Sequence, residues 1–164
     1  MRYKKAVITD TEKHLSRIIS RKLNKLGYKV KIINGRKAPP HRIDLLVSGT
    51  FRYEAICGMV GCIGSRGQII AVGSTADISG ENRNRYILRS YGCEQLLRER
   101  MRETSVCISF VRQGFGGTSI LDDTNSRYQI HSADTKQSIK YLADAVAAIA
   151  ETPDNVDYYC TCEK

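Results

Sequence analysis

Two hydroxyl side chains, Ser74 and Tyr86, stand at a spacing that suits proton transfer. Ser74 follows the apolar run Gln68 to Val72, which predicts a short buried parallel strand, and Tyr86 opens a predicted helix that runs to Met101. A serine at the carboxyl end of a strand can hold a carbonyl oxygen while a phenol in the first turn of a helix gives or takes its proton. The pair is therefore a candidate catalytic site.

This segment resembles the Ser…Tyr-x-x-x-Lys core of the short-chain dehydrogenases/reductases, with Ser74 and Tyr86 at the serine and tyrosine positions. The fourth residue after the tyrosine is Ser90, where the family has lysine. In the family, the lysine ammonium lowers the pKa of the tyrosine and holds the nicotinamide ribose. A phenol without such a charge titrates near about 10 and is a poor acid or base at neutral pH. Arg89 or Arg85 could partly replace the lysine, and Arg89 is the candidate for this role in an active site.

The elements that must position this site begin with a strand, a helix and a second strand. Lys5 to Thr9 is short, apolar and β-branched, and Tyr28 to Ile33 alternates basic and apolar residues. Between them, Asp10 to Leu26 has apolar residues at the spacing of one helix face, and Gly27 is placed to end the helix. Strand, helix and strand within about thirty residues predict a right-handed parallel unit.

The turn after the first strand differs from the dinucleotide-binding pattern of the family. That pattern, T-G-x-x-x-G-x-G, falls on residues 9–16, and each of its glycines is replaced, by Asp10, His14 and Ser16. In the family, the glycines let the backbone approach the pyrophosphate closely at the start of the helix. Here, two carboxylates, Asp10 and Glu12, also stand where the phosphates would lie. The sequence therefore predicts weak or absent NADP(H) binding. The candidate cofactor contacts in this turn are Thr9, Lys13 and His14.

A second difference follows the second strand. Arg36 and Lys37 stand where the family often has a basic residue that selects a 2′-phosphate, so they would favour NADP over NAD. The helix, strand and helix that should come next are missing, and the chain passes through a proline loop to a predicted strand at Ile43 to Val47. By this resemblance, the outer part of the adenosine pocket has been deleted. The Asn-Asn-Ala-Gly turn of the family is also lost, being replaced by Ser48 to Phe51.

The remaining chain predicts the second half of an α/β domain. Its predicted elements are a short helical or irregular crossover at Phe51 to Ile63, a turn at Ser65 to Gly67 before the strand at Gln68, a strand at Ser105 to Val111, a polar loop at Leu121 to Ile130, a helix at Ala133 to Glu151 and a final edge strand at Asn155 to Thr161. After the Ser105 strand, the family motif P-G-x-x-x-T falls on Gln113 to Thr118. Gly114 and Thr118 are therefore candidate cofactor contacts.

Charge is concentrated at the start of the chain. Of the net +9, residues 1–42 carry thirteen Lys and Arg against two acidic residues, a charge of +11, so the rest of the chain carries −2. Such a concentration suits a phosphate-bearing partner, and it equally suits a solvated helix face. An aromatic content of 7% leaves few stacking platforms, which argues against nucleic acid.

Length and composition set the class of protein. A chain of 164 residues predicts one domain, residues 1–164, and the sequence has no apolar run long enough for a membrane span and no signal peptide, which predicts a cytoplasmic protein. The six cysteines and three histidines form no recognised metal-binding spacing. The predicted fold is a Rossmann-like three-layer α/β sandwich with five or six mostly parallel strands, shortened relative to the family.

Two functions follow from the resemblance. The loss of the glycines, of the Asn-Asn-Ala-Gly turn and of the lysine predicts a pseudoenzyme without ordinary redox catalysis. Such a protein would be a structural or regulatory subunit of a homo- or hetero-oligomer. The helix that begins at Tyr86 is the expected interface, because it commonly builds the oligomer interface in the family. The alternative is an active NADP(H)-dependent oxidoreductase that reduces a small carbonyl substrate through Ser74, Tyr86 and Arg89.

Overall fold

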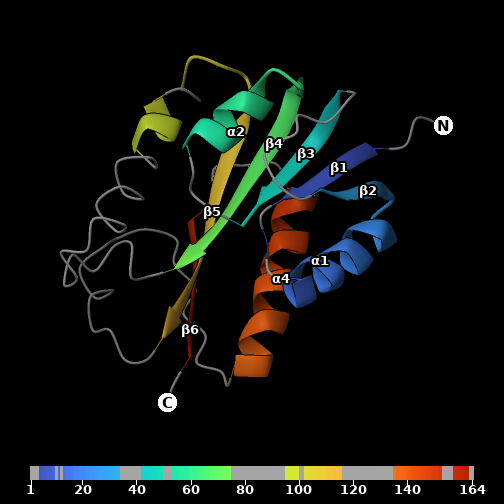
Figure 1. Ribbon diagram of the computed structural model, residues 1–164, viewed down its shortest axis with the longest axis vertical. Coiled ribbons are helices and arrows are strands. Elements are labelled where there is room, and N and C mark those ends of the chain that lie inside the picture. Colours follow the sequence, from blue (N-terminus) through green and yellow to red (C-terminus); the bar gives the residue numbers. More distant parts are fainter. Residues whose placement is uncertain are drawn as a thin grey trace.

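The computed structural model shows an α/β fold with one six-stranded sheet (Figure 1). The structure describes residues 4–9, 11, 13–33, 42–49, 53–74, 95–99, 102–115, 135–152 and 157–162. Its elements are β1 (Lys4–Thr9), α1 (Lys13–Lys25), β2 (Tyr28–Ile33), β3 (Ile43–Ser48), α2 (Tyr53–Val60), β4 (Ile63–Ser74), β5 (Cys107–Phe115), α4 (Thr135–Glu151) and β6 (Asp157–Cys162). Residues 95–99 are also helical.

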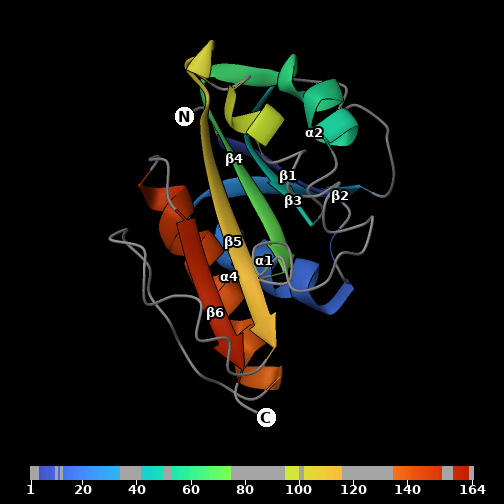
Figure 2. The ribbon, with the colours of Figure 1, turned by 90° about the vertical axis from the view of Figure 1, so that its left-hand side faces the viewer.

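The sheet is entirely parallel, in the order β2-β1-β3-β4-β5-β6. Figure 1 shows α1 and α4 side by side on one face and α2 on the other, and Figure 2 shows β6 beside β5 at the edge away from β2. Three layers of this kind confirm the predicted Rossmann-like architecture. Only nine residues, 34–42, separate β2 from β3, which is too short for the helix, strand and helix that the family places there.

Two apolar clusters hold the layers together, and the period of two along each strand divides the strands between them. Ala6 and Ile8 of β1 pack toward α1 and α4, whereas Val7 packs toward α2. In α1, Leu15, Ile19 and Leu23 recur every four residues and are buried on the sheet. The alternating and helical patterns read from the sequence are therefore the patterns that build the core.

The helix α1 ends where the sequence predicts. Gly27 has a φ of 83°, a left-handed backbone that an L side chain adopts at a cost, and its N–H donates to the Asn24 carbonyl at 3.0 Å. The chain can then turn directly into Tyr28, the first residue of β2. The tight turn fixes the short α1–β2 connection that begins the parallel unit.

Three consecutive carbonyls near the end of α4 are capped by side chains from different parts of the chain. The Ala148 carbonyl accepts from the Thr152 hydroxyl at 3.1 Å. Two buried donors do the rest: Gln68 Nε2 donates to the Ile149 carbonyl at 3.0 Å, and the Tyr28 hydroxyl donates to the Ala150 carbonyl at 3.1 Å. Carbonyls in the last turn of a helix have no partner within the helix. These contacts therefore join α4 to β2 and β4.

Burial also changes the chemistry of Tyr28. Its side chain is buried against α4, and that burial raises the pKa of the phenol. The carboxylates of Asp44 and Glu151 raise the pKa of Tyr28 further, because each disfavours a second negative charge. The folded protein therefore stabilises the neutral, protonated form of the Tyr28 phenol.

The amino-terminal part of β4 differs from the prediction. Ser65 to Gly67, predicted as a turn before a strand at Gln68, lie inside a strand that already begins at Ile63. The register with β3 passes from Ile43 opposite Ile63 to Leu45 opposite Gln68, so two steps along β3 face five along β4. The three extra residues form a bulge. The Gly-Ser-Arg-Gly composition that suggested a turn is the composition of this bulge.

Most other boundaries lie close to the predictions, but β5 continues to Phe115, four residues beyond the predicted end of that strand at Val111. The crossover predicted at Phe51 to Ile63, helical or irregular, contains the helix α2, and the strand predicted from Ser105 begins two residues later. Of the helix predicted from Tyr86 to Met101, the structure describes residues 95–99 as helical, and its first part lies outside the described residues. Within the described part, no helix is long and apolar enough to cross a bilayer. The side chains of Cys57, Cys62 and Cys107 are half-buried.

Candidate functional site

The carboxyl ends of β1 and β3 form the point at which the connections of the sheet change direction. The chain passes from β1 through α1 to β2 on one side, and then returns to place β3 on the other side of β1. Parallel α/β sheets bind their ligands in the crevice at such a switch point. Thr9 and Ser48 end the two strands opposite each other and are fully buried, and the Gly49 N–H donates to the Thr9 carbonyl at 2.9 Å. This pair lies at the centre of the candidate site.

On one side of the site, β4 and β5 extend beyond the carboxyl ends of β1 and β3 (Figure 1). Ser48 pairs with Ala71 in β4, and the strand runs three residues further to Ser74, about 10 Å at 3.3 Å per residue. Ser74 pairs with Gln113 of β5, and Gly114 follows next. Ser74 and Gly114 therefore lie on adjacent strands, at the carboxyl-terminal edge of the sheet, where Thr9 also lies.

The start of α1 also lies at the carboxyl ends of the strands, and its first turn carries side chains where the family has glycines. Lys13 and His14 are exposed in the first turn of the helix. Ser16, at a position where the family has glycine, is buried, and its hydroxyl donates to the Lys13 carbonyl at 3.1 Å. The Thr11 hydroxyl oxygen is also buried, and within the described residues it has no hydrogen-bond partner. Buried polar atoms in folded proteins usually have a hydrogen-bond partner, so the Thr11 hydroxyl is a candidate contact for a ligand.

Five of the ten predicted site residues are therefore gathered at one edge of the sheet: Thr9, Lys13, His14, Ser74 and Gly114. The other five lie outside the described residues: Arg36, Lys37, Tyr86, Arg89 and Thr118. The predicted polar loop from Leu121 to Ile130 lies outside them as well. The roles assigned to these residues from the family resemblance stay predictions.

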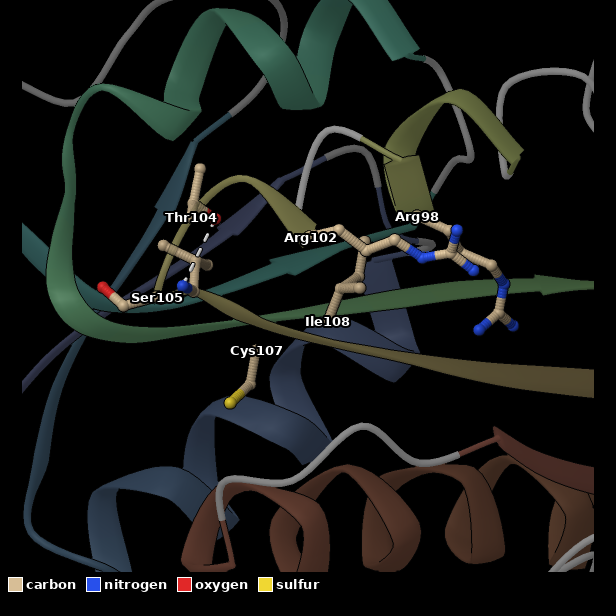
Figure 3. Close-up of a pocket in the computed structure, with 7 residues that line it drawn as sticks. Arg98, Arg102, Thr104, Ser105, Cys107 and Ile108 are labelled. Carbon is tan, nitrogen blue, oxygen red and sulfur yellow. Dashed lines mark hydrogen bonds between the residues drawn. The ribbon is translucent and has the colours of Figure 1, made fainter.

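The sequence did not suggest a hollow of about 450 Å³ at the opposite edge, beside the start of β5 (Figure 3). Arg98 and Arg102, four residues apart in the sequence, line it together with Thr104 and the first residues of β5. The Arg98 guanidinium lies 4.4 Å from the centre of the Phe110 ring, a cation–π contact that also packs its stem. The i, i+4 spacing of the two arginines was the available signal.

A second hollow, of about 320 Å³, lies at the amino ends of β1, β3 and β4. Arg42 donates from Nη2 to the Ser65 hydroxyl at 3.3 Å across it, and Asp44 accepts at 2.7 Å from the Lys5 backbone N–H. The side chains of Arg42 and Asp44 thus have partners within the hollow or beside it. Both hollows are at the edge away from the switch point, so neither is part of the predicted site.

Solved structures with a similar fold include short-chain dehydrogenases/reductases. A short-chain dehydrogenase/reductase from Serratia marcescens is 14% identical, with a TM-score of 0.63 over 96% of each chain. A carbonyl reductase from Pseudomonas aeruginosa, in complex with NADP, is 10% identical, with a TM-score of 0.60 over 96% of each chain. A dehydrogenase/reductase from Sinorhizobium meliloti is 12% identical, with a TM-score of 0.60 over 98% of this chain and 94% of that one. No family model and no curated protein matches the sequence.

The chain therefore has a Rossmann-like α/β fold of the short-chain dehydrogenase/reductase type. The resemblance first seen around Ser74 is confirmed at the level of the fold. The fold is shortened on the side of β2, where this chain has nine residues in place of a helix, a strand and a helix. Fold does not decide activity, which depends on the residues of the site.

Proposed function

We propose that this protein is a short-chain dehydrogenase/reductase-like pseudoenzyme, a structural or regulatory subunit of a homo- or hetero-oligomer without ordinary redox catalysis. The observation that carries the proposal is the end of the sheet at β2. The dinucleotide-binding arrangement has strand order 3-2-1-4-5-6, with a further strand outside the second one. Here β2 itself is the outer strand of the described sheet, and the connection to β3 is too short to supply another.

The turn from β1 to α1 supports the same conclusion. A pyrophosphate is held by backbone N–H groups that it can approach closely, which is why glycines recur in this turn. In this chain the turn has no glycine, Asp10 and Glu12 add negative charge beside it, and the buried Ser16 side chain occupies a glycine position. The fold is retained while the features that hold a dinucleotide are not.

The helical segment at residues 95–99 supports the proposed role as a subunit. Leu97 is fully buried on the sheet, whereas its neighbour Leu96 leaves 48% of its surface exposed. Leu96 belongs to the helix that the family resemblance predicts as an oligomer interface. A partner packed on this helix would bury Leu96 and recover the hydrophobic free energy of its side chain.

We expect the purified protein to be a dimer or larger at micromolar concentration, and Leu96→Glu to shift it toward the monomer. A buried, unpaired carboxylate at an interface is unfavourable, so the dissociation constant should rise at least about tenfold. Light scattering coupled to size-exclusion chromatography measures the mass. Gln95→Glu is the matched control, because it adds the same charge to an exposed neighbouring position and should leave the mass unchanged.

A monomer both alone and after co-expression with related short-chain dehydrogenases/reductases would contradict the proposed subunit role. An oligomer that persists in Leu96→Glu would place its interface elsewhere. The two results separate the existence of an assembly from its location.

The second candidate is an active NADP(H)-dependent reductase of a small carbonyl substrate, with Ser74 orienting the carbonyl, Tyr86 giving the proton and Arg89 replacing the lysine. Its support is the collection of Thr9, Ser74 and Gly114 at one edge. The unpaired Thr11 hydroxyl oxygen lies in the turn where a bound phosphate would accept a hydrogen bond. The similar carbonyl reductase from Pseudomonas aeruginosa is in complex with NADP.

Titration with NADPH and NADH distinguishes the two candidates. The pseudoenzyme proposal predicts no change in nicotinamide fluorescence or melting temperature up to about 1 mM cofactor, an affinity limit near −4 kcal/mol. Micromolar NADPH binding would overturn its cofactor argument. Turnover of a small carbonyl would then be assayed with Tyr86→Phe, which should lower kcat about 10²–10⁴-fold if the phenol gives the proton. Unchanged turnover in this variant would exclude the Ser74/Tyr86 mechanism.

A further inference from the structure

Residues 13–33, which span α1, its turn and β2, contain seven lysines and arginines and no acidic residue. Four of the seven lie four residues apart along α1 and are exposed: Lys13, Arg17, Arg21 and Lys25. We call these four residues the α1 ridge. With a rise of 1.5 Å per residue, the ridge is about 18 Å long and places one cation on each turn, along a row that winds around the helix by about 40° per turn.

None of the four residues of the α1 ridge forms an ion pair within the described residues. The ion pair of α1 in that part of the chain joins Lys22 to Asp144 of α4, and Lys22 lies beside the ridge rather than on it. Like charges four residues apart destabilise a helix. The helix dipole disfavours Lys13 in the first turn, although it favours Lys25 in the last turn. The ridge therefore works against the stability of α1, whose opposite face already anchors it through Leu15, Ile19 and Leu23.

The chemistry of the α1 ridge selects among polyanionic partners. Protein interfaces have a buried apolar or aromatic centre, and helices that bind membranes present apolar residues to the bilayer. The large apolar side chains of α1 face the sheet, and Ile18 packs partly against the same core. The exposed face carries long cations without apolar anchors, which is the composition that phosphate contacts use.

We propose that the α1 ridge binds the phosphate backbone of nucleic acid without reading its sequence. Over about 18 Å, one strand of a B-form duplex carries about five phosphates, enough to face all four cations. The low aromatic content bears on base stacking in single strands, and backbone contact to a duplex does not need stacking. The test of the proposal is independent of the pseudoenzyme assignment, because it changes Arg17 and Arg21, which are outside the predicted cofactor site, and leaves Lys13, a candidate cofactor contact, in place.

The test uses fluorescence anisotropy of the full chain with a labelled duplex of about 20 base pairs. Four phosphate contacts predict a slope of log Kobs against log salt concentration of about −3.6, and a dissociation constant of about 1–100 µM at physiological salt. Arg17→Glu with Arg21→Glu should weaken binding at least about tenfold and reduce the slope to about −1.8, since two contacts remain.

A matched control is available on β2. Lys29 and Lys31 are exposed, and because Tyr28 and Val30 face α1, these lysines face the other side of the sheet. Lys29→Glu with Lys31→Glu changes the net charge by the same amount as the ridge variant but leaves the α1 ridge intact. It should keep the affinity within about threefold and the slope near −3.6. Circular dichroism and the melting temperature confirm that both variants fold.

Each remaining outcome contradicts the proposal. Absence of binding at about 50 mM salt removes it outright. Equal weakening by the two double variants would mean that net charge, and not the α1 ridge, attracts the duplex. Competition by poly-glutamate as effective as by unlabelled duplex, at equal charge concentration, would mean that the ridge takes an acidic protein segment instead of a phosphate backbone.

Discussion

Gly67→Ala is expected to lower the free energy of unfolding by about 3 kcal/mol, the upper end of the range for overpacking a core. A β-carbon at this position would lie 2.2 Å from Cγ2 of Ile63, 3.0 Å from the Gly64 carbonyl oxygen and 3.2 Å from the Asp44 carbonyl oxygen. Ile63 is buried and β-branched, so it cannot turn aside, and the two carbonyls belong to the backbone of the bulge between β3 and β4. The strand must shift to accept one methyl group.

Two other glycines are matched controls in urea denaturation. Gly58 in α2 and Gly61 after it have no atom within 4 Å of an added β-carbon. Gly58→Ala should raise the free energy of unfolding by about 0.5–1 kcal/mol, because alanine is the better helix residue, and Gly61→Ala should change it by less than about 0.5 kcal/mol. If Gly67→Ala unfolds at the same urea concentration as Gly61→Ala, the bulge does not have this geometry.

This bulge could not be predicted from the local sequence. A run of small and polar residues before an apolar strand is ordinary turn composition, and nothing local distinguishes a turn from a three-residue bulge within a longer strand. The difference depends on β3, where Ile43 pairs with Ile63 and Leu45, two residues later, already pairs with Gln68. Gly67 is required by that tertiary contact, which the local pattern does not contain.

The first unit was predictable because its signals are local. Lys4–Thr9, Lys13–Lys25 and Tyr28–Ile33 follow from apolar runs, a helical period and a glycine at the helix end. The gathering of Thr9, Ser74 and Gly114 at one edge also followed, since the carboxyl ends of parallel strands meet at the same side of a sheet. The contacts of Gln68 and Tyr28 with α4 could not be predicted, because they join residues 81 and 122 positions apart.

Those contacts carry the second large effect: Tyr28→Phe combined with Gln68→Met should lower the free energy of unfolding by about 2–6 kcal/mol. Each substitution keeps the approximate shape of a buried side chain and leaves one carbonyl of α4, at Ala150 or Ile149, without its donor. An unsatisfied buried acceptor costs about 1–3 kcal/mol, and the two effects add if the neighbouring carbonyls act independently. Urea denaturation of the single and double variants measures both terms and their coupling.

The exposed Thr152 provides the control at the same helix end. Its hydroxyl caps the Ala148 carbonyl, but water can replace it, so Thr152→Val should cost less than about 0.5 kcal/mol. A cost for Thr152→Val equal to that of Gln68→Met would mean that burial does not distinguish the caps.

The pH dependence of Tyr28 gives an independent measure of the same anchor. Burial, and after it the carboxylates of Asp44 and Glu151, raise the pKa of Tyr28 in the folded protein, whereas the unfolded phenol titrates near about 10. Below that pH both states hold the proton and the contribution is complete. As pH rises above about 10, the unfolded state releases its proton first, so the free energy of unfolding falls until the folded pKa is passed. The difference between the wild type and Tyr28→Phe should therefore be constant from neutral pH to about 9 and decrease above it; a difference that stays constant to higher pH would show that the phenol is not held neutral against α4.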